Sequence, residues 1–392
     1  MLSEKNELIC NVLKAGLADF SFFEISDGDW DYLERELRNQ AAAALPADVI
    51  GSHPAIEERR KNRWKGIAYS HAARWSQILY AQNELVQLMG QHQIQMVILK
   101  GTAAAMYYPI PEYRSMGDID FLVQERDYQK ALELMKENGY TQTDPKDKGE
   151  YHYSLEKNGI IFELHRKLAK LSDNKKGKMV TESVRNGLQH RVWRQIDGYQ
   201  VPVLPWLPNG VVLLCHIRQH LVSGLGLRQI IDWMMYVEKE LDDRKYPYFL
   251  EVIEKAGLED LAIHVTKLCQ KYLGLREEGI SWCIGANEEL CEELMGYIFQ
   301  QGNFGQKVSW EGKGAKALSR SGIEQLRWMQ KQGMRHWRAA RKFPFWGCAA
   351  IFYELFRYIV YVMKKDKPIR SLYLDIKEGR RRRKMFKGLR VP

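Results

Sequence analysis

Two short apolar runs, the first of which is followed by a glycine turn, constrain the fold of this chain more than any other feature. The runs, Met96–Leu99 and Phe121–Val123, have the length and composition of buried strands. A Lys-Gly-Thr sequence at residues 100–102 follows the first run, and the small residues of 103–108 predict the start of a helix. Strand, glycine turn, helix and second strand together predict a sheet that helices cover.

Two carboxylates stand immediately before the second run, at Asp118 and Asp120. Residues two apart on a strand point to the same face, so both side chains are expected side by side at the rim of the sheet. Adjacent like charges repel unless a cation lies between them. The pair therefore predicts a site for phosphate and a divalent metal ion.

A third carboxylate follows about forty residues later in the sequence. Residues 151–155 and 159–164 predict a hairpin, because an Asn-Gly turn separates them. The second strand places Glu163 and His165 on one face, and we expect Glu163 to complete the metal site with His165 supporting it or serving a structural role. The alternative for Glu163 is a surface ion pair with one of the next two basic residues, Arg166 or Lys167.

Helical periodicity dominates from about residue 208 to 300. His216 and His220 are four apart and share one helix face. Ile217 stands where zinc hydrolases carry a glutamate, so core or substrate-facing histidines are favoured over a metal site. Arg228 and Asp232 form either an i,i+4 pair or part of a cleft opposite the Asp pair.

The chain, at 392 residues, is longer than one ordinary core, so we expect several domains of the α+β (mixed α/β) class with a small mixed sheet. Residues 169–200 are polar and weakly patterned. The expected divisions are an N-terminal helical cover, an α/β core, a helical domain and a helical basic extension, at residues 1–91, 92–200, 201–300 and 301–392.

The formal charge of +10 is unevenly distributed. Residues 331–392 carry 18 Lys and Arg against 4 Asp and Glu, which leaves the first 330 residues at −4. The isoelectric point is therefore no evidence that the acidic site binds nucleic acid. Six scattered cysteines without a Cys-x-x-Cys pair and an N-terminus without a signal-peptide core favour a reduced, cytoplasmic setting.

The C-terminal region combines an apolar stretch, 343–363, with a basic run, Arg380–Lys384. Glu354 and Arg357 within the stretch argue against a membrane-spanning helix. A docked helix followed by a solvated, mobile tail is the default expectation. The alternatives are peripheral contact with the inner face of the membrane and, less favoured, contact with nucleic acid.

These motifs together resemble the polymerase-beta-like nucleotidyltransferase superfamily, and more narrowly an uncharacterised bacterial group of nucleotidyltransferase family proteins. The matching elements are Leu99-Lys-Gly-Thr, Tyr108-Pro, Arg114, Gly117-Asp-Ile-Asp-Phe-Leu-Val, Phe162-Glu-Leu-His165 and the segment from His216 to Asp232. The resemblance implies a polymerase-beta-type core, dependence on Mg²⁺ or Mn²⁺, and transfer of a nucleoside monophosphate from an NTP to a hydroxyl acceptor.

Roles for individual residues follow from this chemistry. Asp118, Asp120 and Glu163 are the expected catalytic and metal ligands. The expected contacts to the triphosphate are Lys100, Gly101, Thr102 and Arg114, with a structural pair to Glu112 or Asp118 as the alternative for Arg114. The candidate lining of the cleft comprises His165, His216, His220, Arg228 and Asp232.

Two other classes of function remain open on the sequence. One is a catalytically inactive binding or scaffold protein built on the same fold. The other is a membrane- or nucleic-acid-associated factor that acts through its basic tail. The three clustered acids argue against the first, because a silent site has no need for concentrated negative charge.

Overall fold

The computed structural model describes residues 2–17, 25–143, 152–166, 175–307, 322–337, 347–364 and 369–391. The chain divides into two compact units, Met1–Lys307 and Val308–Pro392. The pocket that holds the predicted acids belongs to the first unit.

The described strands form one seven-stranded mixed sheet in the order β3-β4-β5-β2-β1-β7-β6. β1 pairs antiparallel with β2 and parallel with β7, and β2 pairs parallel with β5. The outer pairs β3–β4, β4–β5 and β6–β7 are antiparallel. The strands are β1 (Met96–Leu99), β2 (Asp118–Val123), β3 (Thr141–Gln142), β4 (His152–Lys157), β5 (Ile160–His165), β6 (Val192–Ile196) and β7 (Tyr199–Val203).

Alternation along the central strands separates a core face from a polar face. On β2, Ile119, Phe121 and Val123 pack in the hydrophobic core, whereas Asp118 and Asp120 point to the opposite face. β5 alternates in the same way, with apolar residues in the core and Glu163 between them. The polar face of two neighbouring strands therefore carries the three carboxylates that the sequence singled out.

Two tight hairpins lie in the two halves of the sheet. The predicted turn between β4 and β5 is present, with Asn158 at φ 54° and Gly159 at φ 74°. Positive φ at both central residues is the geometry of a type I′ turn, which suits Asn-Gly. Tyr151, where the sequence placed the start of the first strand, lies outside the described residues.

The structure corrects the interpretation of residues 169–200 as weakly patterned, because this region holds α7 (Lys175–Gln189) and the hairpin of β6 and β7. Its turn is Asp197-Gly198, at φ 45° and 84°. Asp-Gly between two short strands is the same turn signal as Asn-Gly. The hairpin thus had a readable sequence signature, and it extends the sheet beyond β1.

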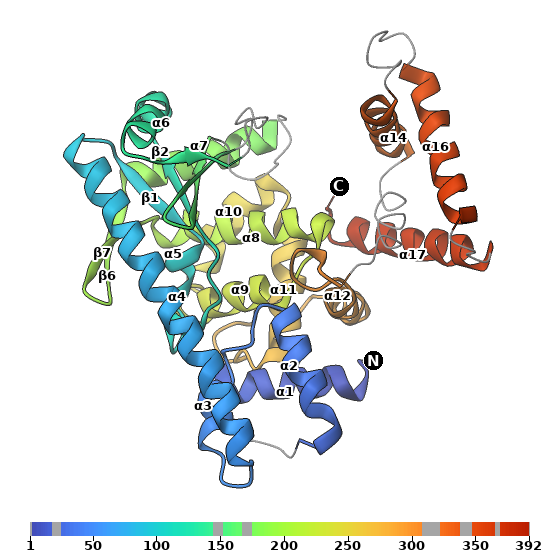
Figure 1. Ribbon diagram of the computed structural model, residues 1–392, viewed down its shortest axis with the longest axis horizontal. Coiled ribbons are helices and arrows are strands. Elements are labelled where there is room, and N and C mark those ends of the chain that lie inside the picture. Colours follow the sequence, from blue (N-terminus) through green and yellow to red (C-terminus); the bar gives the residue numbers. More distant parts are fainter. Residues whose placement is uncertain are drawn as a thin grey trace. The chain divides into compact units, whose positions relative to one another are not determined.

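The long helix α4 (Glu58–Gln91) connects the N-terminal helices with the sheet (Figure 1). It packs against α3 (Ala47–Ser52) at one end and contacts β2 and β7 further along. The Trp75 indole of α4 donates a hydrogen bond to Asp197 in the β6–β7 turn. The other N-terminal helices are α1 (Glu4–Leu17), η1 (Asp27–Asp29) and α2 (Trp30–Asn39), and α1 packs against α11.

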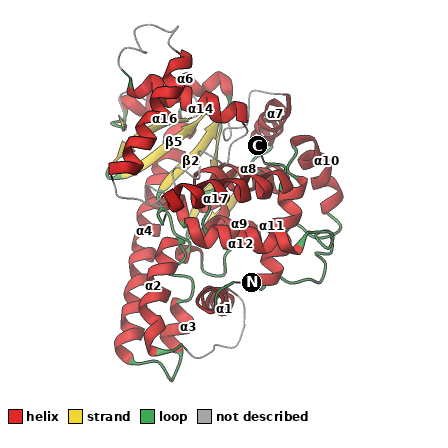
Figure 2. Ribbon diagram, turned by 90° about the vertical axis from the view of Figure 1, so that its right-hand side faces the viewer, coloured by secondary structure: helices red, strands yellow, loops and turns green. Residues whose placement is uncertain are grey.

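The remaining helices of the first unit surround the strands, which are yellow in Figure 2. α6 (Tyr128–Glu137) contributes to the sheet core, and α8 packs on α9. The other elements are α5 (Gly101–Ala105), η2 (Pro111–Tyr113), η3 (Glu125–Asp127), α8 (Trp206–Ser223), α9 (Leu227–Glu240), α10 (Tyr246–Ala256), α11 (Glu259–Leu273), α12 (Glu288–Gln301) and η4 (Asn303–Gly305).

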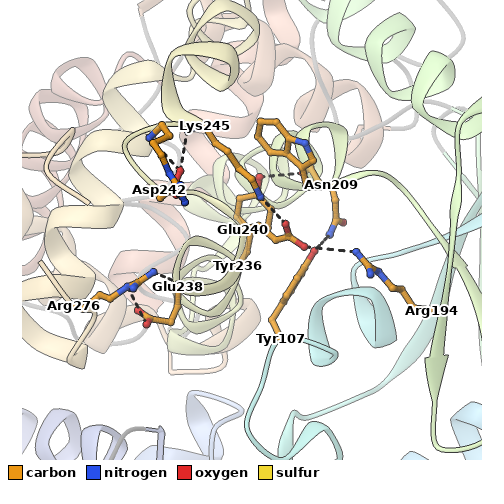
Figure 3. Close-up of polar contacts among 11 residues, drawn as sticks. Tyr107, Arg194, Asn209, Tyr236, Glu238, Glu240, Asp242, Lys245 and Arg276 are labelled. Atoms are coloured by element: carbon orange, nitrogen blue, oxygen red, sulfur yellow. Dashed lines mark hydrogen bonds and ion pairs between the residues drawn. The ribbon is translucent and has the colours of Figure 1, made fainter. Parts of the chain in front are cut away.

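A polar network attaches the end of α9 to its neighbours (Figure 3). Asn209 of α8 donates to the Tyr107 hydroxyl at 3.1 Å. The Glu240 carboxylate at the end of α9 lies 3.1 Å from Lys245 and 3.8 Å from Arg194 on β6. These contacts help to hold α8 and α9 against the sheet.

The second unit contains α14 (Gly322–His336), α16 (Gly347–Lys364) and α17 (Ile369–Gly388). α14 packs closely on α16, where a Cβ added to Gly333 would meet the Ala350 carbonyl oxygen at 1.9 Å. The basic run Arg380–Lys384 lies within α17, so the expected mobile tail is helical here. Among the described helices, none combines the length and apolar character that crossing a membrane requires.

Candidate functional site

The polar face of the sheet opens into a pocket with two chemically different walls. The sheet wall comes from β2, β4, β5 and the connection between β1 and β2. It comprises Lys100, Gly101, Arg114, Gly117, Asp118, Asp120, His152, Glu163 and His165. The helical wall comes from α8, α9 and η4, and comprises His216, Gln219, His220, Arg228 and Phe304.

The three predicted carboxylates converge on the sheet wall. Asp118 and Asp120 share a face of β2, and the parallel register pairs Asp120 with Glu163 on β5. Burial, together with the negative charge of Asp120, raises the pKa of the Asp118 carboxyl to about 6. Carboxylates crowded in this way repel one another, and a bound cation would relieve that repulsion.

Lys100 brings a positive charge to the same cluster. Its Nζ lies 2.7 Å from Asp120 Oδ1. Burial opposes the charge on Lys100, but Asp120 and Asp118 outweigh it and raise the lysine pKa. The backbone of Lys100 adopts φ 50° and ψ −127°, a strained conformation for a residue with a side chain. This strain directs the ammonium group at the acids, directly after β1 ends.

His165 is the second partner of Asp120. Its Nε2 lies 2.7 Å from Asp120 Oδ1 and 3.6 Å from Glu163 Oε2. Burial also opposes the charged form of Asp120, yet Lys100 and His165 hold the pKa of that carboxyl well below its usual range. Asp120 is therefore ionised, whereas the pKa of Asp118 is raised to about 6.

Arg114 lines the pocket, but its guanidinium is engaged by a buried acid from α9. Nε and Nη2 of Arg114 each donate to one Asp232 oxygen at 2.7 Å, and the Tyr108 hydroxyl donates to the same carboxylate. The pairing partner is thus neither Glu112 nor Asp118, which the sequence had suggested. Because both Asp232 oxygens are engaged in this bidentate contact, Asp232 is not among the residues that line the pocket.

Arg228 does not form the i,i+4 pair with Asp232, so that interpretation was wrong and the cleft-lining alternative describes its position. Its Nη1 donates to the Ser115 carbonyl at 3.2 Å. Within the described residues its buried Nε donor has no hydrogen-bond partner. Burial and the nearby Arg114 lower the pKa of Arg228, which marks a cation with too little negative charge around it.

The glycine turn divides into a pocket-facing part and a buried part. Gly101 lines the pocket at φ 30°. The Thr102 side chain is fully buried, and its hydroxyl donates to Gln82 of α4 at 2.6 Å. The Thr102 hydroxyl therefore supports the turn from behind the sheet and does not face the pocket, contrary to the expectation that it would meet phosphate.

The two predicted histidines of α8 lie on the helical wall. The His216 and His220 rings are 4.4 Å apart and nearly perpendicular. Burial, and then the charge of Lys100, lower the pKa of both imidazoles, to about 3 for His220. They are neutral at physiological pH and face the pocket, as one of the two interpretations from the sequence expected.

Phe304 completes the helical wall in a strained conformation. Its ring lies 4.9 Å from the His220 ring and 5.5 Å from the Arg228 guanidinium, and the residue is 53% exposed. Its φ is 54°, in the left-handed region that disfavours residues with a Cβ. Gly224 packs beneath it so closely that an added Cβ would lie 2.0 Å from the Gly305 nitrogen.

The alternative of a surface ion pair for Glu163 receives no support from Arg166, which lies 3.7 Å from Glu125 instead. Lys167 lies outside the described residues. Sequence reasoning missed four lining residues, His152, Gln219, Phe304 and Gly117. The first two had signals, since the two-residue hairpin turn pairs His152 with His165 and helical spacing puts Gln219 beside His216.

The donor chemistry of the sheet wall fits a divalent cation. Three carboxylates meet there, one of them with a pKa raised by burial and the crowding of negative charge. Mg²⁺ prefers carboxylate oxygens together with phosphate oxygens and water. The arrangement can hold a metal ion and a phosphate ester against the sheet, with a larger organic group toward the helical wall.

The sequence model of one protein family, described as uncharacterised nucleotidyltransferase, matches residues 26–274. The match includes both strands with the acids and α9, and it ends before η4. No curated protein shows significant similarity to the chain.

Proposed function

Because the chain belongs to a family of uncharacterised nucleotidyltransferases, we propose that the pocket transfers a nucleoside monophosphate from an NTP to a hydroxyl group of an acceptor. The observation that carries this proposal is the convergence of Asp118, Asp120 and Glu163 on two adjacent parallel strands, with the pKa of Asp118 raised to about 6. Mixed sheet and helices are consistent with a nucleotidyltransferase fold.

The three carboxylates would hold Mg²⁺, or Mn²⁺ in its place, by a two-metal arrangement. When bound, such ions neutralise the triphosphate and lower the pKa of the attacking hydroxyl. Asp120 contributes a permanent negative charge, because Lys100 and His165 keep it ionised. Glu163, which pairs in register with Asp120, reaches the same region from β5.

The cationic contact to the triphosphate is best supplied by Arg228. The Nε and Nη2 donors of Arg114 are already hydrogen-bonded to Asp232. Arg228 lines the pocket and has an Nε donor without a partner within the described residues. An arginine that lacks a carboxylate partner gains most from an incoming phosphate. Lys100 and the backbone at Gly101 complete the proposed nucleotide contacts from the sheet wall.

The decisive experiment measures NTP binding by calorimetry and pyrophosphate release from each NTP, with and without Mg²⁺. We expect both to require Mg²⁺ and the Asp118→Ala/Asp120→Ala double variant to lose turnover by a factor of about 1,000. Glu137→Gln, which removes an exposed charge on α6, is the matched control and should behave as the wild type. Wild-type turnover in the double variant would refute the site.

A nucleotide-binding protein without transfer activity is the second candidate, and the Lys100–Asp120 pair favours it. An ammonium group 2.7 Å from Asp120 already neutralises one of the acids without any metal. This candidate expects NTP to bind equally well in the presence of a chelator and Asp120→Asn to leave the affinity unchanged. Mg²⁺-dependent binding together with Mg²⁺-dependent pyrophosphate release would decide for the transferase.

A further inference from the structure

The sheet wall carries, on β4 and β5 beside the acids, a second set of metal-ligand groups that includes two imidazoles. The ligand atoms of His152, Glu163 and His165 all lie within 4.8 Å of one another. His152 begins β4, whereas Glu163 and His165 end β5. We propose that these three residues form a site for a first-row transition metal ion such as Zn²⁺, distinct in its chemistry from the carboxylate site for Mg²⁺.

Strand register builds this set. The antiparallel pairing of β4 and β5 puts His152 directly opposite His165, so the two side chains project from the same face. Glu163 precedes His165 by two residues and therefore shares that face. The two imidazole rings lie 5.4 Å apart. Neither histidine depends on a loop, because both are held by the ladder of a rigid hairpin.

The distances are already close to those of ligands on one ion. His152 Nε2 lies 3.6 Å from Glu163 Oε1, and His165 Nε2 lies 3.6 Å from Glu163 Oε2. Two ligands with bonds of about 2.1 Å to one tetrahedral or octahedral ion are separated by roughly 3 Å. Closing the set requires a rotation of the His152 side chain, which is 33% exposed, and release of His165 Nε2 from its 2.7 Å contact with Asp120 Oδ1.

The chemical types of the ligands determine which metal ion the site prefers. Imidazole nitrogens suit Zn²⁺ and related later first-row ions, whereas Mg²⁺ strongly prefers oxygen. Asp118 and Asp120 supply only oxygen on the neighbouring strand, so the two halves of the sheet wall differ in their preference. The inference deepens the proposed function, since Glu163 belongs to both sets and would join a transition metal to the Mg²⁺–nucleotide site.

A purely structural role for the histidines makes a different prediction. In that role His152 and His165 would donate hydrogen bonds that orient Glu163, and no metal affinity would depend on them. His165 already contacts Asp120 at 2.7 Å, so its substitution also disturbs the carboxylate site. Among the described acids, His152 lies within ion-pair distance of Glu163 alone, which makes it the cleaner residue to change.

The test titrates metal into the full-length chain after chelation and dialysis, without nucleotide. Zn²⁺ affinity is measured against a competing chromophoric chelator, and Mg²⁺ affinity by calorimetry. We expect one Zn²⁺ per chain, bound about 100-fold more tightly than Mg²⁺. His152→Asn should weaken Zn²⁺ binding by about 10-fold or more.

Two control variants separate the sites. Asp118→Asn should leave Zn²⁺ affinity within about 3-fold, because Asp118 is outside the histidine set. His92→Asn removes an exposed histidine after α4 and should change nothing. Unchanged Zn²⁺ affinity in His152→Asn, or equal affinities for Zn²⁺ and Mg²⁺, would overturn the proposal.

The readout is metal binding, so its failure is distinguishable from failure of the proposed function. Loss of the histidine site leaves Mg²⁺-dependent pyrophosphate release as a separate question. Conversely, a histidine-dependent Zn²⁺ site in a chain that releases no pyrophosphate supports the metal site and counts against the transferase.

Discussion

The two walls of the pocket are built from different kinds of residues and respond differently to their surroundings. The sheet wall gathers charge, with three carboxylates, Lys100 and two histidines on neighbouring strands. The helical wall carries two neutral imidazoles, an aromatic ring and an arginine whose Nε has no partner among the described residues. Under the proposed function, we expect the sheet wall to perform the chemistry and the helical wall to recognise the substrate.

The largest expected effect compares one substitution on each wall. Asp120→Asn should reduce the turnover number by about 1,000-fold, because it removes a proposed metal ligand and leaves Lys100 without its partner. His216→Asn should reduce it by less than about 10-fold and act mainly on KM. Steady-state kinetics with pyrophosphate detection measures both. Equal losses in kcat for the two variants would remove the division of labour between the walls.

The second prediction concerns the contact that joins the walls. Arg114, from the connection between β1 and β2, makes a bidentate pair with Asp232 of α9, and both side chains are almost fully buried. Asp232→Ala strands a buried cation, so we expect the free energy of unfolding to fall by about 3–5 kcal/mol. Urea denaturation measures the change.

The exposed Arg244–Asp242 pair is the matched control for this experiment. Its geometry also involves two guanidinium donors, but the Arg244 side chain is 91% exposed. Asp242→Asn should leave the denaturation midpoint where it is in the wild type, because solvent screens an exposed pair. A similar cost at both positions would mean that the Arg114–Asp232 pair does not hold the walls together.

The third prediction uses the opposite pH dependence of the two walls. Burial lowers the pKa of His220 to about 3, below its unfolded value of about 6.5, so the unfolded chain takes up the proton first and stability falls as the pH drops below 6.5. The pKa of Asp118 is raised to about 6, above its unfolded value of about 3.9, so this acid favours the folded state at low pH and opposes it as the pH rises through 6.

Substitution on each wall should therefore change the slope of stability against pH in opposite directions. Between pH 7.5 and 5, His220 lowers the free energy of unfolding of the wild type by about 2 kcal/mol, and His220→Asn should abolish that decrease. Asp118 raises the free energy of unfolding over the same fall in pH, so Asp118→Asn should abolish that increase and leave the protein more sensitive to acid. Urea unfolding at four pH values measures both slopes, and parallel profiles for the two variants would contradict the assignment of these shifts.

The walls also differ in how far the sequence predicts them. The sheet wall depends on spacing within one or two strands, so the pattern of residues is enough to place Asp118, Asp120 and Glu163 together. His152 followed from the same hairpin, because a two-residue Asn-Gly turn fixes every cross-strand pair. The β6–β7 hairpin had an Asp-Gly turn of the same kind, but the polar residues Arg194, Gln195 and Gln200 near that turn obscured it.

The helical wall was predictable only where one helix carries the information. Four-residue spacing put His216 and His220 together, whereas the same rule wrongly paired Arg228 with Asp232. A buried acid pairs with the partner that the tertiary structure brings into the best geometry, and for Asp232 that partner is Arg114, which makes a bidentate contact. Phe304 depends on the close approach of Gly224 to Gly305, which lies far along the chain, and no local pattern encodes that contact.

The smallest expected effect tests whether Phe304 recognises the nucleobase. Its half-exposed ring lies in the pocket between His220 and Arg228, and the strained backbone holds it there. Stacking of one base on an aromatic side chain contributes about 1–3 kcal/mol, so Phe304→Ala should raise the KM for the NTP by about 10-fold with little change in kcat. Phe304→Tyr keeps the ring and should retain the wild-type KM. If alanine and tyrosine behave alike, the ring does not contact the base, and the helical wall recognises the substrate through Arg228 and the histidines instead.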